Sequence, residues 1–411
     1  MKTKMEMVDI NRLVPYVNNA RTHSKEQITK LRSSLREFGF INPVIIDSKF
    51  NIIAGHGRVM AAKEEKMEQV PCVLVDYLSE AQKKAYIIAD NKMALDAGWD
   101  EELLRVEIEA LEDMGFDLNL TGFDVADLDD LFKDESKVKD DYFDVDEELN
   151  KPTLSRQGDI WTLGRHRLLV GDSTKEESYT KLLEGKKVNL VVTDPPYNVN
   201  YEGDAGKIKN DNMDKNTFYQ FLFDAFSNME NLMADDASIY VFHADTEGLN
   251  FRRAFEDAGF YLSGTCIWKK QSLVLGRSPY QWQHEPVLYG WKKKGKHKWY
   301  TGRKESTIWE FDKPKKNGDH PTMKPIPLIA YPIMNSSTSN SIVLDSFGGS
   351  GSTLIACEQT DRICYTMELD EKYADVIVKR YIEQVGKADE VSVQRDGVSF
   401  SYDEVVKMSG E

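Results

Sequence analysis

Residues 341–359, SIVLDSFGGSGSTLIACEQ, decide the fold class of this chain. The stretch predicts a short apolar strand, a glycine-rich turn and the start of a helix. Its glycines at 348, 349 and 351 allow a tight turn and a close approach of the backbone to a ligand. The helix start adds free N–H groups and the positive end of a dipole. A loop of this kind on its own is equally compatible with a plain strand-to-helix turn.

An acid at the end of the next strand favours ligand binding. Glu368 follows Asp345 by roughly 20 positions, the spacing at which nucleotide-binding units place a ribose-binding acid. Together, the loop and this acid predict a site for an adenosine-bearing ligand.

Other apolar runs predict the sheet around this loop. VNLVVTD (188–194) and ASIYVFHAD (237–245) are continuous runs, as expected for strands buried on both faces of a parallel sheet. From about residue 152 onward, strands alternate with helices, which indicates a doubly wound α/β sheet.

The stretch VVTDPPYNVN (191–200) places an acid, two prolines and an aromatic directly after one of these strands. Each proline removes a backbone donor and fixes its own φ, so the strand must end there. Asp194 and Tyr197 then lie in a stiff turn at the carboxyl edge of the sheet, where open α/β sheets bind ligands. A strand-end cap is the plain alternative for Asp194.

Composition bounds the class of protein. The chain has 411 residues, enough for two or three domains, with 41% hydrophobic and 30% charged residues. No apolar run approaches the roughly 20 residues of a membrane span, and we expect no signal peptide. Four scattered cysteines, none of them paired at metal-ligand spacing, favour a reducing cytoplasm and no metal site. The order of domains given below would fit a bacterium or a phage-infected cell.

Charge is unevenly distributed along the chain. The net charge of −16 argues against nucleic acid at first sight, but residues 124–150 are strongly acidic and residues 291–304 are basic and interleaved with aromatics. This asymmetry leaves a nucleic-acid partner open. We predict a small α/β domain at 1–94, a helical and acidic linker at 95–151, a main α/β domain at 152–386 and a tail at 387–411.

Three motifs carry a resemblance to a known family. TDPPYN, HPTMKP (320–325) and DSFGGSGST, in this order, resemble the circularly permuted β-class of amino DNA methyltransferases, which use S-adenosylmethionine. The resemblance covers roughly residues 152–386 and implies a Rossmann-like sheet. It also implies methylation of adenine N6 or cytosine N4 in double-stranded DNA, and related enzymes are often homodimers.

The resemblance implies where the cofactor binds. Thr322 and Lys324 would lie by its methionine part and Asp172 by its adenine, although a surface charge or surface turn is as plausible for Lys324 and Asp172. One departure is Ser346, where the family usually has proline. The implied cofactor-binding residues are Asp172, Asp194, Thr322, Lys324, Asp345, Phe347, Gly348, Gly349, Gly351 and Glu368.

The implied chemistry answers why the acid and prolines follow the strand. A base flipped out of the duplex would offer its amine to the Asp194 carboxylate and the Pro195 carbonyl oxygen. Accepting these hydrogen bonds localises the lone pair on the nitrogen, and Pro196, like Pro195, offers an acceptor without a competing donor. Tyr197 would stack on the base.

Residues 199–319, between the motifs, are the region that should read DNA. Its basic residues would neutralise phosphates, although a solvated surface charge is the plainer interpretation of any single lysine. The candidates are Lys269, Lys270, Arg277, Lys292, Lys293 and Lys294. No target sequence follows from them.

The N-terminal segment, roughly residues 9–76, resembles the ParB/sulfiredoxin-like family. Two glycines, a cation and a helix start make a reasonable pocket for the phosphates of a nucleotide or of DNA. The pocket residues are Arg21, His23, Gly55, His56, Gly57 and Arg58. The loop departs from the family's Gly-Glu-Arg-Arg pattern, and the active cysteine of sulfiredoxin is missing. A DNA-binding or dimerising module with a vestigial pocket is the alternative.

The leading hypothesis is a site-specific DNA adenine-N6 methyltransferase, because Asp rather than Ser begins the catalytic motif. Cytosine N4 is the alternative within the same class. A ParB-like DNA-binding or nucleotide-switch protein with a regulatory methyltransferase half is the alternative from another class.

Overall fold

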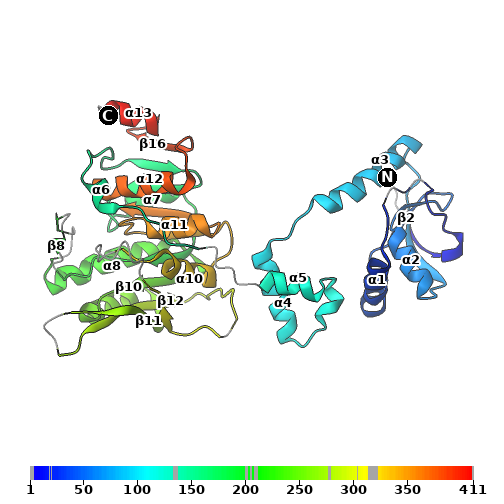
Figure 1. Cartoon of the computed structure of the whole chain (residues 1–411), viewed down its shortest axis with the longest axis horizontal. Helices are drawn as coiled ribbons and strands as arrows, with labels where there is room; N and C mark the ends of the chain where they lie inside the picture. Colours follow the sequence, from blue (N-terminus) through cyan, green and yellow to red (C-terminus); the bar gives the residue numbers. More distant parts are fainter. Residues whose placement is uncertain are drawn as a thin grey trace. The chain divides into compact units, whose positions relative to one another are not determined.

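Figure 1 shows the computed structural model of the chain, which forms two compact units, residues 1–134 and 135–411. The structure describes residues 4–17, 19, 21–132, 138–199, 202–203, 206–207, 212–275, 279–302, 304–312 and 323–409. None of the helices described in these ranges is long and apolar enough to cross a membrane.

The first unit is built on a four-stranded sheet with the order β1-β4-β2-β3. β1 runs antiparallel to β4, and β2 runs parallel to β4. Buried aliphatic residues of these strands meet those of two helices in one core. The elements are β1 (Lys4–Asp9), η1 (Ile10–Arg12), α1 (Lys25–Phe38), β2 (Val44–Ile46), β3 (Ile52–Ala54), α2 (His56–Glu64) and β4 (Gln69–Leu74). The prediction of a small N-terminal α/β domain is confirmed.

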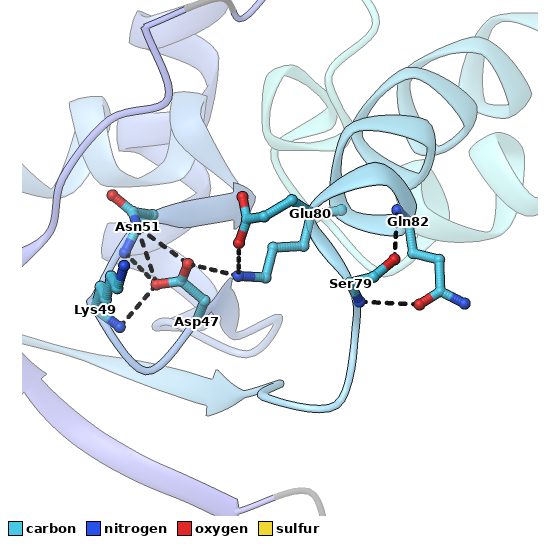
Figure 2. Close-up of polar contacts among 7 residues, drawn as sticks. Asp47, Lys49, Asn51, Ser79, Glu80 and Gln82 are labelled. Atoms are coloured by element: carbon cyan, nitrogen blue, oxygen red, sulfur yellow. Dashed lines mark hydrogen bonds and ion pairs between the residues drawn. The ribbon is translucent and has the colours of Figure 1, made fainter.

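Helix α3 (Glu80–Asp96) is tied to this sheet at its first turn (Figure 2). Ser79 and Gln82 form a capping box, which satisfies two backbone donors at the helix start. One turn on, the Lys83 ammonium contacts Asp47 Oδ2 at 3.0 Å, in the turn between β2 and β3. Because Asp47 is buried, this pair fixes where α3 leaves the domain.

Three shorter helical segments follow α3: α4 (Glu101–Asp113), η2 (Leu118–Thr121) and α5 (Val125–Phe132). Asp100 caps α4 through the backbone N–H of Leu103. α3 and α4 are thus separate helices, and α4, η2 and α5 lie within the segment that we predicted as a helical and acidic linker.

The second unit contains an eleven-stranded sheet with the order β13-β11-β12-β10-β7-β14-β15-β6-β5-β16-β17. Its centre, from β10 to β6, is parallel. The strands are β5 (Ile160–Leu163), β6 (His166–Val170), β7 (Val188–Thr193), β10 (Met233–Phe242), β11 (Phe260–Val274), β12 (Trp282–Lys292), β13 (Ile308–Glu310), β14 (Ile342–Asp345), β15 (Ile363–Glu368), β16 (Val391–Arg395) and β17 (Val398–Ser401). A separate two-stranded pair is formed by β8 (Glu202–Gly203) and β9 (Gly206–Lys207).

Helices cover both faces of this sheet (Figure 1). One apolar cluster joins α7, α8 and α9 to one face, and a second joins α10, α11 and α12 to the other. The helices are α6 (Val145–Leu149), α7 (Glu176–Leu183), α8 (Lys215–Leu232), α9 (Gly248–Asp257), α10 (Ile326–Ser336), α11 (Ser352–Gln359), α12 (Glu371–Val385) and α13 (Tyr402–Ser409), with η3 (Asp245–Glu247) between β10 and α9. The predicted doubly wound sheet is confirmed.

The chain leaves β7 and β14 in opposite directions. From β7 it passes through α8 to β10 on one side, and from β14 it passes through α11 to β15 on the other. The point between β7 and β14 is therefore the topological switch point, where doubly wound sheets bind ligands.

The segment that we predicted as a tail supplies β16, β17 and α13. β16 pairs antiparallel with β5, and Tyr402 and Val405 of α13 are buried against the same core as Trp161.

Candidate active site

Asp194 is the first residue beyond β7, at the switch point. Its Oδ2 accepts a hydrogen bond from the Lys324 ammonium at 2.6 Å, and its Oδ1 accepts one from the Tyr197 hydroxyl at 2.6 Å. Lys324 also lies 3.1 Å from the Tyr197 oxygen and is buried just before α10. The structure thus brings together three predicted residues from two motifs far apart in the sequence.

Glu285 joins these residues, although sequence reasoning missed it. It lies in β12, where its Oε2 is 3.3 Å from the Lys324 ammonium and 3.2 Å from the Tyr197 oxygen. Its Oε1 is 2.6 Å from the ammonium of Lys270. The available signal was an acid inside the otherwise apolar strand HEPVLYG, a position where an unpaired charge is costly.

Charge balance explains how five ionisable groups, Asp194, Tyr197, Lys270, Glu285 and Lys324, lie so close together. Burial opposes ionisation of Glu285, but Lys324 and Lys270 lower its pKa to about 2. Burial likewise opposes the charge on Lys324, but Asp194 and Glu285 raise its pKa well above the usual range. Burial and the two carboxylates raise the pKa of Tyr197, so its phenol stays protonated at neutral pH.

Asn198 holds the turn that carries Asp194 and Tyr197. It lies in the left-handed region at φ 57°, which asparagine tolerates better than most residues. Its side chain accepts from the Met213 N–H at 2.6 Å and donates to the Met213 carbonyl at 3.0 Å. Pro195 is buried and Pro196 is half-buried in the same turn.

The glycine loop lies next to this turn, at the end of β14. Gly349 donates its N–H to Glu368 Oε2 at 2.8 Å, which ties the loop to the end of β15. Gly348 has no room for a side chain, since an added Cβ would lie 2.7 Å from Thr366 Oγ1. Gly351 directly precedes α11 at φ 84° and leaves the first N–H groups of that helix without a side-chain cap.

Two buried acids near the loop, Asp345 and Glu368, have raised pKa values. Burial raises the pKa of Asp345 to about 7 and that of Glu368 also to about 7, although backbone and side-chain donors partly offset this. Asp345 accepts from Thr193 at 2.9 Å and from the Phe347 N–H at 3.1 Å, so it joins β14 to β7. Glu368 accepts from the Asp370 N–H at 2.8 Å as well as from Gly349.

Ser346, the departure from the family pattern, is buried and lies 3.1 Å from the hydroxyl of Tyr179. This bond to α7 restrains a position where the family's proline would restrain the backbone. The ring of Phe347 lies 5.7 Å from that of Phe221 on α8.

The loop after β6 brings Asp172 to the same edge of the sheet. Gly171 donates its N–H to the Glu368 carbonyl at 2.9 Å. Asp172 Oδ1 accepts from the N–H and the hydroxyl of Thr174, both at 2.8 Å. Thr322 and Arg277, also predicted as site residues, lie outside the described residues.

The predicted DNA-binding lysines fall into two groups. Lys270 lies in the active-site cluster, and Lys269 beside it pairs with Glu310 at 2.7 Å. β12 runs antiparallel to β10, so Lys292 at its end lies at the opposite edge of the sheet. Lys292 lies 3.7 Å from Asp235 there.

The neighbours of Lys292 continue this second group. The ammonium of Lys293 donates to the Glu256 carbonyl at 2.6 Å, and Lys294 is exposed. Their role as DNA contacts stays a prediction.

The predicted pocket residues of the first unit gather around the start of α2. Gly55 has φ 101° there, and an added Cβ would lie 3.2 Å from the Arg58 guanidinium. Gly57 faces the ring of His23, since a Cβ would meet it at 3.0 Å. The His56 ring accepts from the Tyr16 N–H at 3.2 Å.

Burial lowers the pKa of both His56 and Arg58. Arg58 Nε is buried without a hydrogen-bond partner among the described atoms. Arg21 reaches Asn91 on α3 at 3.3 Å. No group of three or more histidine, cysteine or acidic residues that could hold a metal ion is found among the described parts of either unit.

The fold and this site define a DNA methylase. A family model described as DNA methylase matches residues 188–379, one described as ParB N-terminal domain matches residues 1–91, and one described as ParB-methyltransferase HTH domain matches residues 102–157. The last overlaps the segment that we predicted as a linker. The chain thus carries a ParB N-terminal domain at its N-terminus and an N6/N4 DNA methylase domain in its C-terminal region.

Three known proteins are each similar to part of this chain. The chain is 49% identical over 86 residues to the ParB-like nuclease domain-containing protein YnaK of Escherichia coli K12, covering 20% of this chain and 99% of that protein. It is 25% identical over 236 residues to the type II methyltransferase M.HpaI of Haemophilus parainfluenzae, and this match covers 52% of this chain and 73% of that protein. Among solved structures, the crystal structure of the M1.HpyAVI–SAM complex matches with 23% sequence identity and a TM-score of 0.41, covering 52% of this chain and 98% of that one.

Proposed function

We propose that the chain is a site-specific DNA methyltransferase that transfers a methyl group to N6 of adenine. One observation carries the proposal. Asp194 and Tyr197 after β7 lie at the switch point beside the glycine loop after β14, and Glu368 ends the strand next to that loop. An acceptor for an amine and a cradle for an adenosine group thus meet at one edge of the sheet.

The cofactor is S-adenosylmethionine, and the donors and acceptors at the loop fit it. Each oxygen of Glu368 accepts one backbone N–H, which leaves lone pairs for the two hydroxyls of a ribose. The uncapped first turn of α11 presents N–H groups next to Gly351. When bound, this group supplies an electrophilic sulfonium methyl.

The residues of the chain would prepare the target amine. An exocyclic amine is a poor nucleophile because its lone pair is delocalised into the ring. The Asp194 carboxylate and the Pro195 carbonyl oxygen would accept its two N–H groups and localise the lone pair on nitrogen. Tyr197 would hold the flipped base by stacking, which is worth about 1–3 kcal/mol per base. Asp194 is also placed to take up the proton that the methylated amine releases.

Lys324 is the residue for which we infer a role other than the expected one. It contacts Asp194 and Glu285 directly, and we infer that it orients the carboxylate that meets the amine rather than pairing with the methionine carboxylate. Adenine is favoured over cytosine because Asp, not Ser, begins the DPPY motif.

The test is transfer of labelled methyl from S-adenosylmethionine to unmethylated duplex DNA, followed by digestion and separation of the nucleosides. We expect N6-methyladenine from the full chain and none from Asp194→Ala, which should still bind DNA. N4-methylcytosine would keep the site and change the base. No labelled nucleoside from a chain that binds the cofactor would contradict the proposal.

A further inference from the structure

We propose that Glu285 is a positioning residue that receives the hydrogen bonds of Tyr197 and Lys324 when a target base reaches Asp194. The inference rests on the proposed function, because it concerns how an amine gains access to Asp194. It assigns a role to a residue of β12 that neither the DPPY motif nor the glycine loop includes.

Each carboxylate oxygen of Asp194 already accepts one hydrogen bond in this structure. Its Oδ1 accepts from Tyr197 and its Oδ2 accepts from Lys324, both at 2.6 Å. An oxygen that already accepts a short, charge-assisted hydrogen bond has less electron density to offer a second donor. A base amine that depends on Asp194 to localise its lone pair would therefore compete with two donors of the protein.

Glu285 is the acceptor to which both donors can move. Its Oε2 lies 3.2 Å from the Tyr197 oxygen and 3.3 Å from the Lys324 ammonium. A phenol has a single hydrogen, so Tyr197 donates to one carboxylate at a time. The shorter distance places that hydrogen on Asp194 here, and a small rotation about the C–O bond transfers it to Glu285.

Lys270 keeps Glu285 ready for this exchange. It holds Oε1 at 2.6 Å, so Oε2 points toward Lys324 and Tyr197. Lys270 lies on β11 and Glu285 on the adjacent β12, and both side chains are mostly buried. The cluster therefore contains two carboxylates and two ammonium groups, and moving the donors between the carboxylates leaves its net charge unchanged.

Glu285→Gln tests the exchange. An amide oxygen is a weaker acceptor than a carboxylate, so both donors should stay on Asp194. A hydrogen bond to a charged acceptor contributes more free energy than one to a neutral acceptor. We therefore expect Glu285→Gln to lower kcat about tenfold to hundredfold and to leave the KM for S-adenosylmethionine unchanged. Glu310→Gln is the matched control, since Glu310 also pairs with a lysine, Lys269, at 2.7 Å but stands outside the cluster. We expect it to keep the kcat of the unmodified chain.

A second substitution separates positioning from a merely structural role. Tyr197→Phe removes the hydrogen that competes for Asp194 Oδ1. In the unmodified chain we expect it to lower kcat a few-fold, because the bond to Glu285 that would orient the ring is lost. In the Glu285→Gln background we expect the same change to raise kcat several-fold. Equal reductions in both backgrounds would overturn the inference.

A third measurement needs neither DNA nor cofactor. In ¹⁵N–¹H spectra of the lysine ammonium groups, Lys324 should exchange its hydrogens slowly, because it is buried between two carboxylates. Glu285→Gln should speed that exchange several-fold, whereas Glu310→Gln should not. Unchanged exchange in Glu285→Gln would show that Glu285 does not hold Lys324. Absence of methyl transfer by the unmodified chain would instead contradict the proposed function alone.

Discussion

The ammonium of Lys324 lies 2.6 Å from Oδ2 of Asp194, so a residue just before α10 is paired with the first residue beyond β7. The pair spans the two motifs HPTMKP and DPPY, and the Lys324 side chain is only 8% exposed. We therefore expect Lys324 to act on Asp194, where the target amine would bind, and not on the cofactor.

Lys324→Met should therefore lower kcat rather than weaken cofactor binding. The substitution leaves two mostly buried carboxylates, Asp194 and Glu285, without the cation that they share. We expect a loss of about tenfold to hundredfold, the range for a hydrogen bond between charged groups. Steady-state kinetics with each substrate varied in turn would separate kcat from the two KM values. Lys387→Met, at an exposed pair with Glu390, is the control. A large rise in the KM for S-adenosylmethionine at constant kcat would instead support pairing with the methionine carboxylate.

Substitutions of Tyr197 should separate its ring from its hydroxyl. Tyr197→Ala removes the stacking surface, and about 1–3 kcal/mol of stacking corresponds to roughly 5-fold to 150-fold in kcat/KM for DNA. Tyr197→Phe keeps the ring and should lose much less. The measurement is kcat/KM on one duplex substrate, with Tyr261→Ala as the control, because Tyr261 lies near the start of β11 at the opposite edge of the sheet. Equal losses for Ala and Phe would show that the hydroxyl, not the ring, carries the effect.

What could be predicted depended on the range of the interaction. The turn after residue 193 and the loop after β14 are written in consecutive residues, through prolines that end a strand and glycines that permit a turn. The cap of α1 at Ser24 is local in the same way, since its side chain accepts from Gln27 three residues later. Each of these features could be predicted from a few neighbouring residues.

The remaining features depended on which strands are neighbours. Glu285 lies beside Tyr197 and Lys324 only because β12 pairs with β10, and β10 with β7. Because β12 is antiparallel to β10, Lys292 lies at the edge of the sheet opposite Asp194. The sequence alone had grouped Lys292 with Lys269 and Lys270 as candidates for one DNA-binding region. No local pattern contains strand order or direction, so this half of the site required the tertiary structure.

Glu368 should make cofactor binding depend on pH. Its pKa of about 7 means that it is partly protonated at neutral pH, and ribose hydroxyls donate better to the ionised form. Binding should release up to one proton, so affinity should rise between pH 6 and pH 8, by at most about tenfold per pH unit. Calorimetry in buffers of different ionisation enthalpy would measure the released proton.

Glu368→Gln should flatten this pH profile. At pH 8 it should also bind S-adenosylmethionine about tenfold to hundredfold more weakly, because hydrogen bonds to a charged acceptor are lost. Glu383→Gln is the control, since Glu383 is exposed on α12. An identical pH profile for Glu368→Gln and the unmodified chain would remove Glu368 from the cofactor site.

Asp345 should make the chain less stable as pH rises. Burial raises its pKa in the folded state to about 7, above the value of roughly 3.9 in an unfolded chain. The folded state therefore binds the extra proton, and the stability contributed by this group is complete below about pH 4 and lost as pH rises through 7. The slope from one such group is at most about 1.4 kcal/mol per pH unit. Asp345→Asn keeps an oxygen that can accept from Thr193 but cannot ionise. Its melting temperature should fall less between pH 6 and pH 8 than that of the unmodified chain. Asp235→Asn is the control, because that side chain is 96% exposed, and it should leave the pH dependence of the melting temperature unchanged.

The opposite outcome is equally clear. If Asp345→Asn melts with the same pH dependence as the unmodified chain, the proton is bound by another group. Glu368, with its similarly raised pKa, then becomes the group to test next.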